Sequence, residues 1–447
     1  MITVRHSLRL AFLAVGLFAL GGCDTLSGIF TSEDKDKLPG TRISVLQLER
    51  ELRPNVESVD TQIALPRPED AAVWPGAGGL SHHAMHHLVI SDAPKRAWTV
   101  SAGEGSGLRN RNFAEPVVGI GRIYTMDADG RVYCFDSMTG KRLWRIETAP
   151  EKEEDNAFLG GALALDSGKL FVTTGAAQVI AFDANTGKEI WRSNVDTPIR
   201  AAPTVNAGRV FVVTVENEIV AIAADTGRRL WNYSGSTTAT ILLGGAAPAV
   251  DGGVVVAALS SGELVALRTD NGTPLWNETV VAVRRTEAAA SLPDIAARAV
   301  IDKGRVYAVG QSGVLAAVDL RTGRRIWDVP VAGIYEPWIA GDFLYAITLD
   351  SEAVCIDARS GRILWVTQLP RFEDEEARKG RIVWAGPALA SDRLLLVSSN
   401  GEALSVSPYS GAVLGRIELR SASSQSPVFA GGTMYLLDDD GDLSAYR

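Results

Sequence analysis

The chain has 447 residues, of which 46% are hydrophobic and 22% charged, the composition of a folded protein with ample core material. A formal net charge of −9 and scattered Lys and Arg residues argue against a nucleic-acid ligand, because phosphate binding needs a basic face. The length allows either two or three ordinary domains or one large all-β ring.

Residues 1–22 have the pattern of a bacterial signal peptide. Arg5 and Arg9 give a basic start, and the apolar stretch 10–20 that follows is too short to span a bilayer. The stretch ends at Cys23 in the sequence LGGC, which resembles a lipobox, the signal for cleavage before an acylated cysteine. The alternative is an ordinary secretory signal with a chance cysteine. We predict lipid attachment at Cys23 and a protein tethered to a membrane on its periplasmic side.

The residue after Cys23 bears on which membrane holds the anchor. Asp24 stands where an aspartate is associated with inner-membrane retention in lipoproteins of enteric bacteria. We predict the periplasmic face of the outer membrane, with inner-membrane retention left open. Residues 23–93 are predicted to be the acylated N-terminus, a flexible tether and a lead-in segment.

Four of the five histidines lie in this lead-in, in an H-H-x-x-H-H pattern: His82, His83, His86 and His87. On a helix, each i, i+4 pair would suit a transition metal. No cysteine or clear third ligand lies nearby, so we predict no functional metal site, and a segment that packs on the fold that follows.

Seven copies of a D-x-x-T-G-x-x-L-W pattern, some weaker than others, follow at intervals typical of propeller blades. Clear copies run from Asp136 to Trp144, Asp183 to Trp191, Asp319 to Trp327 and Asp357 to Trp365. A glycine at the turn position of every copy indicates a tight turn that needs positive φ. The fixed place of the tryptophans predicts packing between blades rather than a cofactor stack.

Each unit is predicted to be four antiparallel strands, with a proline opening the innermost strand in six copies and the tryptophan on the outermost. Six hairpins between the second and third strands have Gly or Asn at the turn. The eighth unit, from about Pro427, stops after its third strand, and the sequence around Trp98 can supply the fourth. We predict an all-β protein: one eight-bladed β-propeller over residues 94–447, closed by pairing an N-terminal strand with the C-terminal blade.

Two local patterns are explained by the blade repeat rather than by a metal site or a disulfide. The acidic DDDGD at 438–442 places Gly441 at the register of the hairpin glycines, so it is predicted to be a turn and not a calcium loop. Cys134 and Cys355 fall at equivalent blade positions where other copies have Ala or Ser. We predict two small buried residues with free thiols, in blades too far apart for a disulfide.

The repeat is similar to that of two families with different functions, the quinoprotein alcohol dehydrogenases and the BamB lipoproteins of the bacterial β-barrel assembly machinery. The first resemblance implies pyrroloquinoline quinone (PQQ), calcium ligands and an adjacent-cysteine disulfide, but this chain has no adjacent cysteines. The second matches the lipobox, the tether and a propeller without long insertions. It extends to the sequences at 241–253 and 284–308, which look like that family's inter-blade loops and strands.

The BamB resemblance implies a contact surface for the POTRA domains of BamA on these loops. Carried over by position, the predicted partner-binding residues are Thr240, Ile241, Leu242, Leu243, Gly244 and Asp294. Leu243 and Ala296 depart from the charged residues of the enteric pattern, so an apolar contact is expected rather than a salt bridge. The alternative for the leucines is packing between blades.

The predicted function is therefore a non-enzymatic scaffold with no catalytic residue, cofactor or metal. Its expected partners are BamA, other subunits of the machinery, and unfolded outer-membrane proteins as candidate clients. The alternatives are a PQQ-dependent oxidoreductase and a periplasmic propeller that binds another partner.

Overall fold

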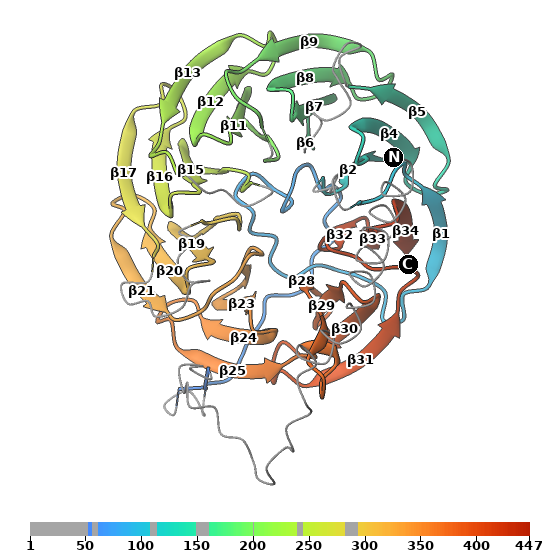
Figure 1. The fold of residues 1–447 in the computed structure, drawn as a ribbon, viewed down its shortest axis with the longest axis vertical. Coiled ribbons are helices and arrows are strands. Elements are labelled where there is room, and N and C mark those ends of the chain that lie inside the picture. The colour runs from blue at the N-terminus through green and yellow to red at the C-terminus, as the bar shows by residue number, and fades with distance from the viewer. Residues whose placement is uncertain are drawn as a thin grey trace, which may run out of the picture. The chain divides into compact units, whose positions relative to one another are not determined.

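The computed structural model describes residues 52–55, 61–107, 114–148, 161–199, 201–238, 245–281 and 294–447. These residues form eight four-stranded antiparallel sheets arranged as blades of a ring (Figure 1), and one separate two-stranded hairpin. The prediction of an all-β, eight-bladed propeller is confirmed. Within this described part of the chain, no helix has the length and apolar character needed to cross a bilayer.

Each blade runs from a short innermost strand at the centre of the ring to an outermost strand at its rim (Figure 1). Blades 1 to 4 are β2 (Val117–Gly119), β3 (Arg122–Met126), β4 (Arg131–Asp136), β5 (Arg142–Glu147); β6 (Gly161–Asp166), β7 (Lys169–Thr174), β8 (Gln178–Asp183), β9 (Glu189–Asn194); β10 (Thr204–Asn206), β11 (Arg209–Val213), β12 (Glu218–Ala223), β13 (Arg229–Ser234); and β14 (Ala249–Asp251), β15 (Val254–Ala258), β16 (Glu263–Arg268), β17 (Pro274–Thr279). Blades 5 to 7 are β18 (Val300–Asp302), β19 (Arg305–Gly310), β20 (Val314–Asp319), β21 (Arg325–Val329); β22 (Trp338–Ala340), β23 (Phe343–Ile347), β24 (Glu352–Asp357), β25 (Ile363–Gln368); and β28 (Trp384–Ala390), β29 (Arg393–Ser398), β30 (Glu402–Val406), β31 (Val413–Glu418).

Blade 8 combines strands from two distant parts of the chain. Its inner strands are β32 (Val428–Ala430), β33 (Thr433–Leu437) and β34 (Asp442–Tyr446), and its outermost strand is β1 (Arg96–Ser101). β1 pairs antiparallel with β34, and Lys95 and Arg447 exchange two backbone hydrogen bonds of 2.7 and 2.9 Å at the end of this ladder. No turn connects β34 to its outermost strand.

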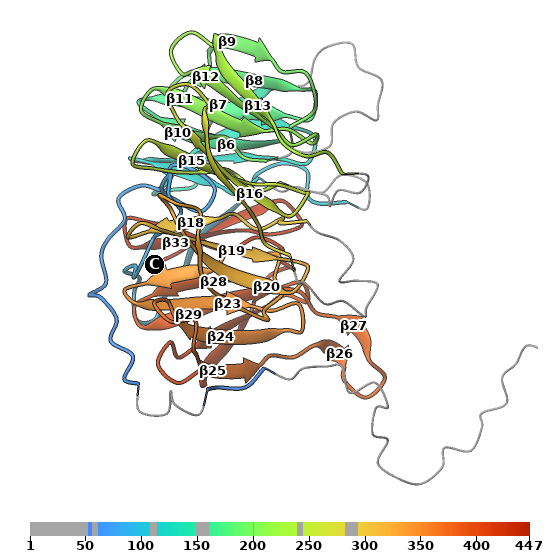
Figure 2. The ribbon, with the colours of Figure 1, turned by 90° about the vertical axis from the view of Figure 1, so that its left-hand side faces the viewer.

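Strand direction gives the ring two different faces. Because strands alternate in direction, the first-to-second turns of all blades and the third-to-fourth turns of blades 1 to 7 lie on one face, which we call the turn face. The second-to-third hairpins and the connections between blades lie on the opposite face, which we call the loop face. The hairpin of β26 (Phe372–Asp374) and β27 (Lys379–Arg381) extends from the loop face, and residues 61–95 lie on the turn face (Figure 2).

The tryptophan of each repeat joins one blade to the next. A Cβ atom added to Gly272 in blade 4 would lie 2.6 Å from the ring of Trp231 in blade 3, so the ring lies directly against the turn. The indole of Trp231 also donates a hydrogen bond of 3.1 Å to the carbonyl oxygen of Thr269 in that turn. The same close approach occurs between Gly140 and Trp98, Gly187 and Trp144, Gly227 and Trp191, Gly323 and Trp276, Gly361 and Trp327, and Gly411 and Trp365. The prediction of packing between blades is confirmed.

The hairpins between second and third strands follow the predicted turns in six blades. Their turn residues have φ between 63° and 103°: Gly130, Asn217, Gly262, Gly313, Gly401 and Gly441. Blades 2 and 6 instead use Ala177 and Ser351, both at φ 58°, a conformation that costs an L-residue about 1 kcal/mol. The prediction that a proline opens the innermost strand is wrong for blade 7. There β28 begins at Trp384, and Pro387 lies inside it where the register with β29 shifts.

The two local patterns form part of the blades. The DDDGD sequence forms the hairpin between β33 and β34, where Asp438 Oδ1 accepts a hydrogen bond of 2.8 Å from the amide of Asp442. Cys134 on β4 and Cys355 on β24 are buried free thiols, as predicted. Burial raises the pKa of Cys134 to about 11, so this thiol stays protonated near neutral pH.

Replacing Gly272 with Ala should test the junction between blades. Gly272 and Gly208 have φ of 71° and 73°, but a Cβ atom meets nothing within 4 Å at Gly208. Both substitutions therefore cost about 1 kcal/mol of backbone strain. We expect Gly272→Ala to lose a further ~1–3 kcal/mol, because its methyl group pushes the Trp231 ring away. Free energies of unfolding in urea measure both, and equal losses would contradict this account of the junction.

Candidate functional site

The lead-in segment crosses the centre of the turn face and bonds to every blade. We call residues 61–90 the plug. Its backbone or side chains hydrogen-bond to an innermost strand, or a residue beside one, in each blade: Trp74 with Val118, Pro75 with Leu165, Ser81 with Asn206 and Val250, His82 with Ile301, His86 with Trp338, Leu88 with Leu389, and Ala71 with Gly431. These bonds are 2.6 to 3.1 Å long, so the plug is fixed across the ring.

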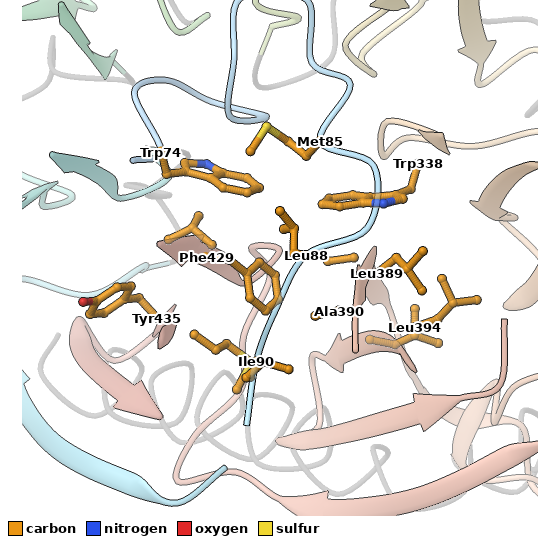
Figure 3. Packing of buried hydrophobic residues seen from close by; sticks show 14 of the residues in the cluster. Trp74, Met85, Leu88, Ile90, Trp338, Leu389, Ala390, Leu394, Phe429 and Tyr435 are labelled. Atoms are coloured by element: carbon orange, nitrogen blue, oxygen red, sulfur yellow. The ribbon is translucent and has the colours of Figure 1, made fainter. Parts of the chain in front are cut away.

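Apolar side chains of the plug fill the centre between the blades. Trp74, 2% exposed, stacks on Trp338 of blade 6 with ring centroids 6.5 Å apart and lies 6.2 Å from Phe429 of blade 8. Leu88 and Met85 complete the packing around these rings (Figure 3). The centre of the ring on this face is therefore filled by the chain itself.

The histidines belong to this packing and do not form a helix. Nδ1 of His83 lies 2.8 Å from the carbonyl oxygen of Ala299, and burial lowers the pKa of His83 to about 3, which keeps the ring neutral. His87 accepts a hydrogen bond of 2.9 Å from the amide of Asp392 at Nε2, so its Nδ1 donates to the carbonyl oxygen of Pro66 at 2.7 Å. In the described ranges, no three His, Cys, Asp or Glu side chains converge as metal ligands would.

A charged cluster lies beside the plug at the centre of the ring. Arg298 pairs with Glu115 at 2.5 Å and with Glu336, although the three side chains are only 16%, 9% and 13% exposed. Glu115 also accepts a hydrogen bond of 3.1 Å from the amide of Gly78 in the plug. Each charged residue stands two positions before an innermost strand, in blades 1, 5 and 6. The cluster thus ties three inter-blade connections to one another and to the plug.

The charges in this cluster depend on one another. Burial, with a further contribution from the nearby charge of Glu115, raises the pKa of Glu336 to about 7 against the opposing attraction of Arg298. Burial also opposes the charge on Arg298, but its two carboxylate partners raise its pKa above the usual value. Two carboxylates share one guanidinium, so ionising both leaves an unbalanced buried charge.

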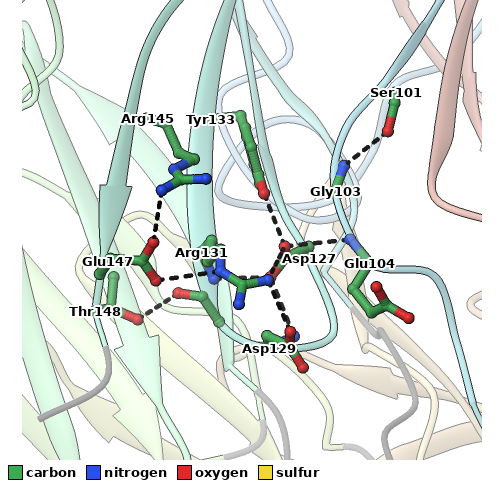
Figure 4. A network of polar contacts seen from close by, with 11 residues as sticks. Ser101, Gly103, Glu104, Asp127, Asp129, Arg131, Tyr133, Arg145, Glu147 and Thr148 are labelled. Carbon is green, nitrogen blue, oxygen red and sulfur yellow. Dashed lines mark hydrogen bonds and ion pairs between the residues drawn. The ribbon is translucent and has the colours of Figure 1, made fainter. Parts of the chain in front are cut away.

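A second polar network fixes the end of β1 to the first blade on the loop face (Figure 4). Asp127, 4% exposed, accepts hydrogen bonds from the hydroxyl of Tyr133 at 2.9 Å and from the amide of Glu104, which follows β1, at 3.2 Å. Arg131 lies between this carboxylate and Asp129, at 3.5 and 2.7 Å. Asp127 and Arg131 therefore satisfy one another and their neighbours, which is a structural role.

Most of the predicted site residues lie outside the part of the chain that the structure describes. This applies to Cys23 and to the loop residues Thr240, Ile241, Leu242, Leu243 and Gly244. Asp294 is described: it is 6% exposed, directly before blade 5, and its carbonyl oxygen accepts a hydrogen bond of 3.2 Å from the amide of Gln311. The partner-binding residues remain predictions.

The charged cluster was missed by reasoning from the sequence, although a signal existed. Glu115-Pro116 and Glu336-Pro337 place glutamate at one register of two blades, and Arg298 falls at the same register of a third. Other blades have a small residue there, as in Ala202-Pro203 and Ala247-Pro248. Charged residues of both signs at a position that faces the ring axis predict a central ion pair.

Replacing Glu336 with Gln should change how stability depends on pH. The pKa of Glu336 rises from 4.5 in the unfolded chain to about 7 in the folded one, so the folded state binds the extra proton between these values. The stabilisation that Glu336 gives the folded state by binding a proton is complete below pH 4.5 and is lost as pH rises through 7. We expect Glu336→Gln to gain on the order of 1–3 kcal/mol relative to wild type between pH 5 and 8.

Chemical unfolding at several pH values measures this gain. His83 acts in the opposite direction, because its lowered pKa disfavours the folded state as pH falls below 6.5. His83 is unchanged in the variant, so the difference between the two proteins isolates Glu336. A difference that does not change with pH would contradict the account.

Comparison with known proteins places this fold in a family. A family model described as "Outer membrane protein assembly factor BamB" matches residues 128–367, more than half of the chain. The BamB protein of Marinobacter adhaerens is 27% identical over 161 residues, which are 35% of this chain and 38% of that protein. The matched region thus spans well under two thirds of that relative's length.

Two solved structures have the same fold. The crystal structure of BamB from Moraxella catarrhalis matches with a TM-score of 0.66 and 18% identity, covering 79% of this chain and 100% of that one. A europium-containing methanol dehydrogenase matches with a TM-score of 0.66 and 16% identity, covering 84% of this chain and 98% of that one. Because the family model covers more than half of the chain, the chain belongs to the BamB family of outer-membrane protein assembly factors.

Proposed function

We propose that this chain is a scaffold lipoprotein of the β-barrel assembly machinery, which binds the POTRA domains of BamA and assists folding and insertion of outer-membrane β-barrel proteins. Membership of the BamB family carries this proposal. The architecture supports it, because a tryptophan packs on the turn of the next blade at seven junctions and the connections between blades form loops on one face. Loops held by a rigid framework are common recognition surfaces.

The loop face is the favoured contact surface for BamA. The plug covers the centre of the turn face with backbone hydrogen bonds and buried rings, so that face is already engaged by the chain. Asp294 belongs to the connection between blades 4 and 5 and therefore to the loop face. The exposed acidic residues 373–376 of the β26–β27 hairpin extend from the same face and would favour a basic partner surface.

The lipid anchor at Cys23 would hold this scaffold at the periplasmic face of the outer membrane, with Asp24 leaving retention at the inner membrane as the alternative. Other subunits of the machinery and unfolded outer-membrane proteins are further partners in this proposal. A dissolved scaffold would have to find BamA by diffusion, whereas a tethered one is held at high effective concentration.

A non-enzymatic role fits the centre of the ring. The rings of Trp74 and Trp338 stack there, and the guanidinium of Arg298 is paired with the carboxylates of Glu115 and Glu336. The alternative, a PQQ-dependent oxidoreductase, is favoured by the structural similarity to methanol dehydrogenase. The cysteines are at positions 23, 134 and 355, so no adjacent pair is available for the disulfide that the quinoprotein resemblance implies.

Affinity capture tests the proposed partner. The full-length lipoprotein, tagged at its C-terminus, is isolated from gently solubilised membranes, and the captured proteins are identified by mass spectrometry. We expect BamA and its companion subunits, because the anchor and the loop face would bring them together. A propeller of another lipoprotein serves as the control, and capture without BamA would overturn the proposal.

Titration with PQQ and calcium separates the two functions. The scaffold account predicts no stoichiometric change in the quinone absorbance, because the centre of the ring is filled by the chain's own side chains. Uptake of one PQQ per chain would instead assign the protein to the oxidoreductases.

A further inference from the structure

One outermost strand differs from the other seven. β1, β5, β9, β13, β17, β21 and β25 each carry a tryptophan that covers the turn of the next blade, whereas β31 has Gly415 at that register. The next blade explains the exception, because blade 8 takes its outermost strand from β1 and has no third-to-fourth turn to be covered. At the junction of blades 7 and 8, where the propeller closes, both the tryptophan side chain and the turn that it would cover are therefore missing.

β31 is exposed along its whole length, and the missing contact accounts for the exposure at the registers of Gly415 and Ile417. All six of its residues are exposed, and Val413, Leu414 and Ile417 are 52%, 55% and 51% exposed. Ile146 has the register of Ile417 on β5, where it packs against the core between blades 1 and 2. We call Val413–Ile417 the seam strip, a mostly apolar surface of about 17 Å along an edge strand.

The chemistry of the seam strip indicates what would cover it. β31 is the last strand of its sheet, so one edge carries backbone donors and acceptors that a strand can pair and a lipid tail cannot. Gly415 and Ile417 face one side of the strand, and Arg416 and Glu418 face the other. An extended segment whose apolar and polar side chains alternate would match both sides.

The chain itself provides a precedent for such pairing at an outer edge. Asn55, far upstream of blade 6, donates its backbone N–H to the carbonyl oxygen of Ile363 on β25 at 2.9 Å. The amide of Ile363 donates in turn to the side-chain oxygen of Asn55 at 2.7 Å. The outer edge of a blade can therefore hold a residue from a distant part of the chain through one backbone and one side-chain hydrogen bond.

We propose that the seam strip on β31 is a docking edge for an extended β-strand segment of a client protein, one in which apolar side chains alternate with polar ones. Strands of β-barrels have this pattern. The inference rests on the proposed role in outer-membrane assembly and adds a binding site to it. The site is separate from the loop face, since its residues lie on the rim of blade 7.

Two substitutions at the strip should weaken docking without affecting the fold. A Cβ atom at Gly415 meets nothing within 4 Å, so Gly415→Trp has room and would place a ring over the strip. Ile417→Lys replaces a half-exposed apolar side chain with a charge. Leu275→Lys is the matched control, because Leu275 is 44% exposed on β17, where the next residue is the junction tryptophan Trp276.

Binding is measured by fluorescence anisotropy with a labelled peptide of about ten residues in which Val and Leu alternate with Thr and Asn. We expect Gly415→Trp and Ile417→Lys each to weaken binding about tenfold, and Leu275→Lys to bind like wild type. Thermal unfolding of each variant verifies the fold. No binding by wild type, no effect of either strip variant, or an equal loss in the control would overturn the proposal.

Two further measurements distinguish this proposal from dimerisation through the strip and from the proposed contact with BamA. A dimer of wild type that Ile417→Lys abolishes would assign the strip to a second copy of the chain and overturn the client assignment. Capture of BamA by Gly415→Trp at the wild-type level, together with weakened peptide binding, supports a separate docking edge. If wild type captures no BamA, the proposed function fails, whereas the peptide measurement still decides the docking edge.

Discussion

The ring depends on one repeated contact, the tryptophan of an outermost strand lying against the turn of the following blade. A buried tryptophan removes 150–250 Å² from water, roughly 4–6 kcal/mol of gross stabilisation at each junction. The glycine beneath the ring is required twice, by its positive φ and by the 2.6 to 3.2 Å approach of the indole. Because every described junction but one has this contact, the exception at Gly415 is a feature of the closure of the ring and not a random loss.

The second constraint acts at the centre. Eight blades alone leave their innermost strands facing the ring axis, and the plug pairs with them, while Arg298 bonds blades 1, 5 and 6 across the same space. Burying a charged cluster of this kind costs desolvation energy, which offsets the attraction between its charges. Its role is therefore to specify how the connections are arranged, more than to raise the free energy of unfolding. The result for function is a difference between the faces: the turn face binds the chain's own plug, and the loop face carries the connections.

The repeat made the blades, their number and the role of the tryptophans predictable, because identical local chemistry recurs at a fixed register. Ala177 and Ser351 could not be predicted as hairpin residues, since neither favours positive φ and only the surrounding ladder holds them there. The plug was expected to pack on the propeller, but its path was not predictable. His83 bonds to the carbonyl oxygen of Ala299, and His87 bonds to backbone groups of Pro66 and Asp392. Contacts between such separate parts of the sequence leave no periodic signal. The pairing of Glu115 with Arg298 also joins residues far apart in sequence.

The central claim is that the loop face meets BamA, and site-specific photocrosslinking tests it most directly. Glu216, in the second-to-third hairpin of blade 3, is exposed on the loop face, and Asp225, in the third-to-fourth turn of the same blade, is exposed on the turn face. With a photoreactive residue at each position in turn, the account predicts crosslinks to BamA from position 216 and none from position 225. Crosslinks from position 225 alone would contradict it.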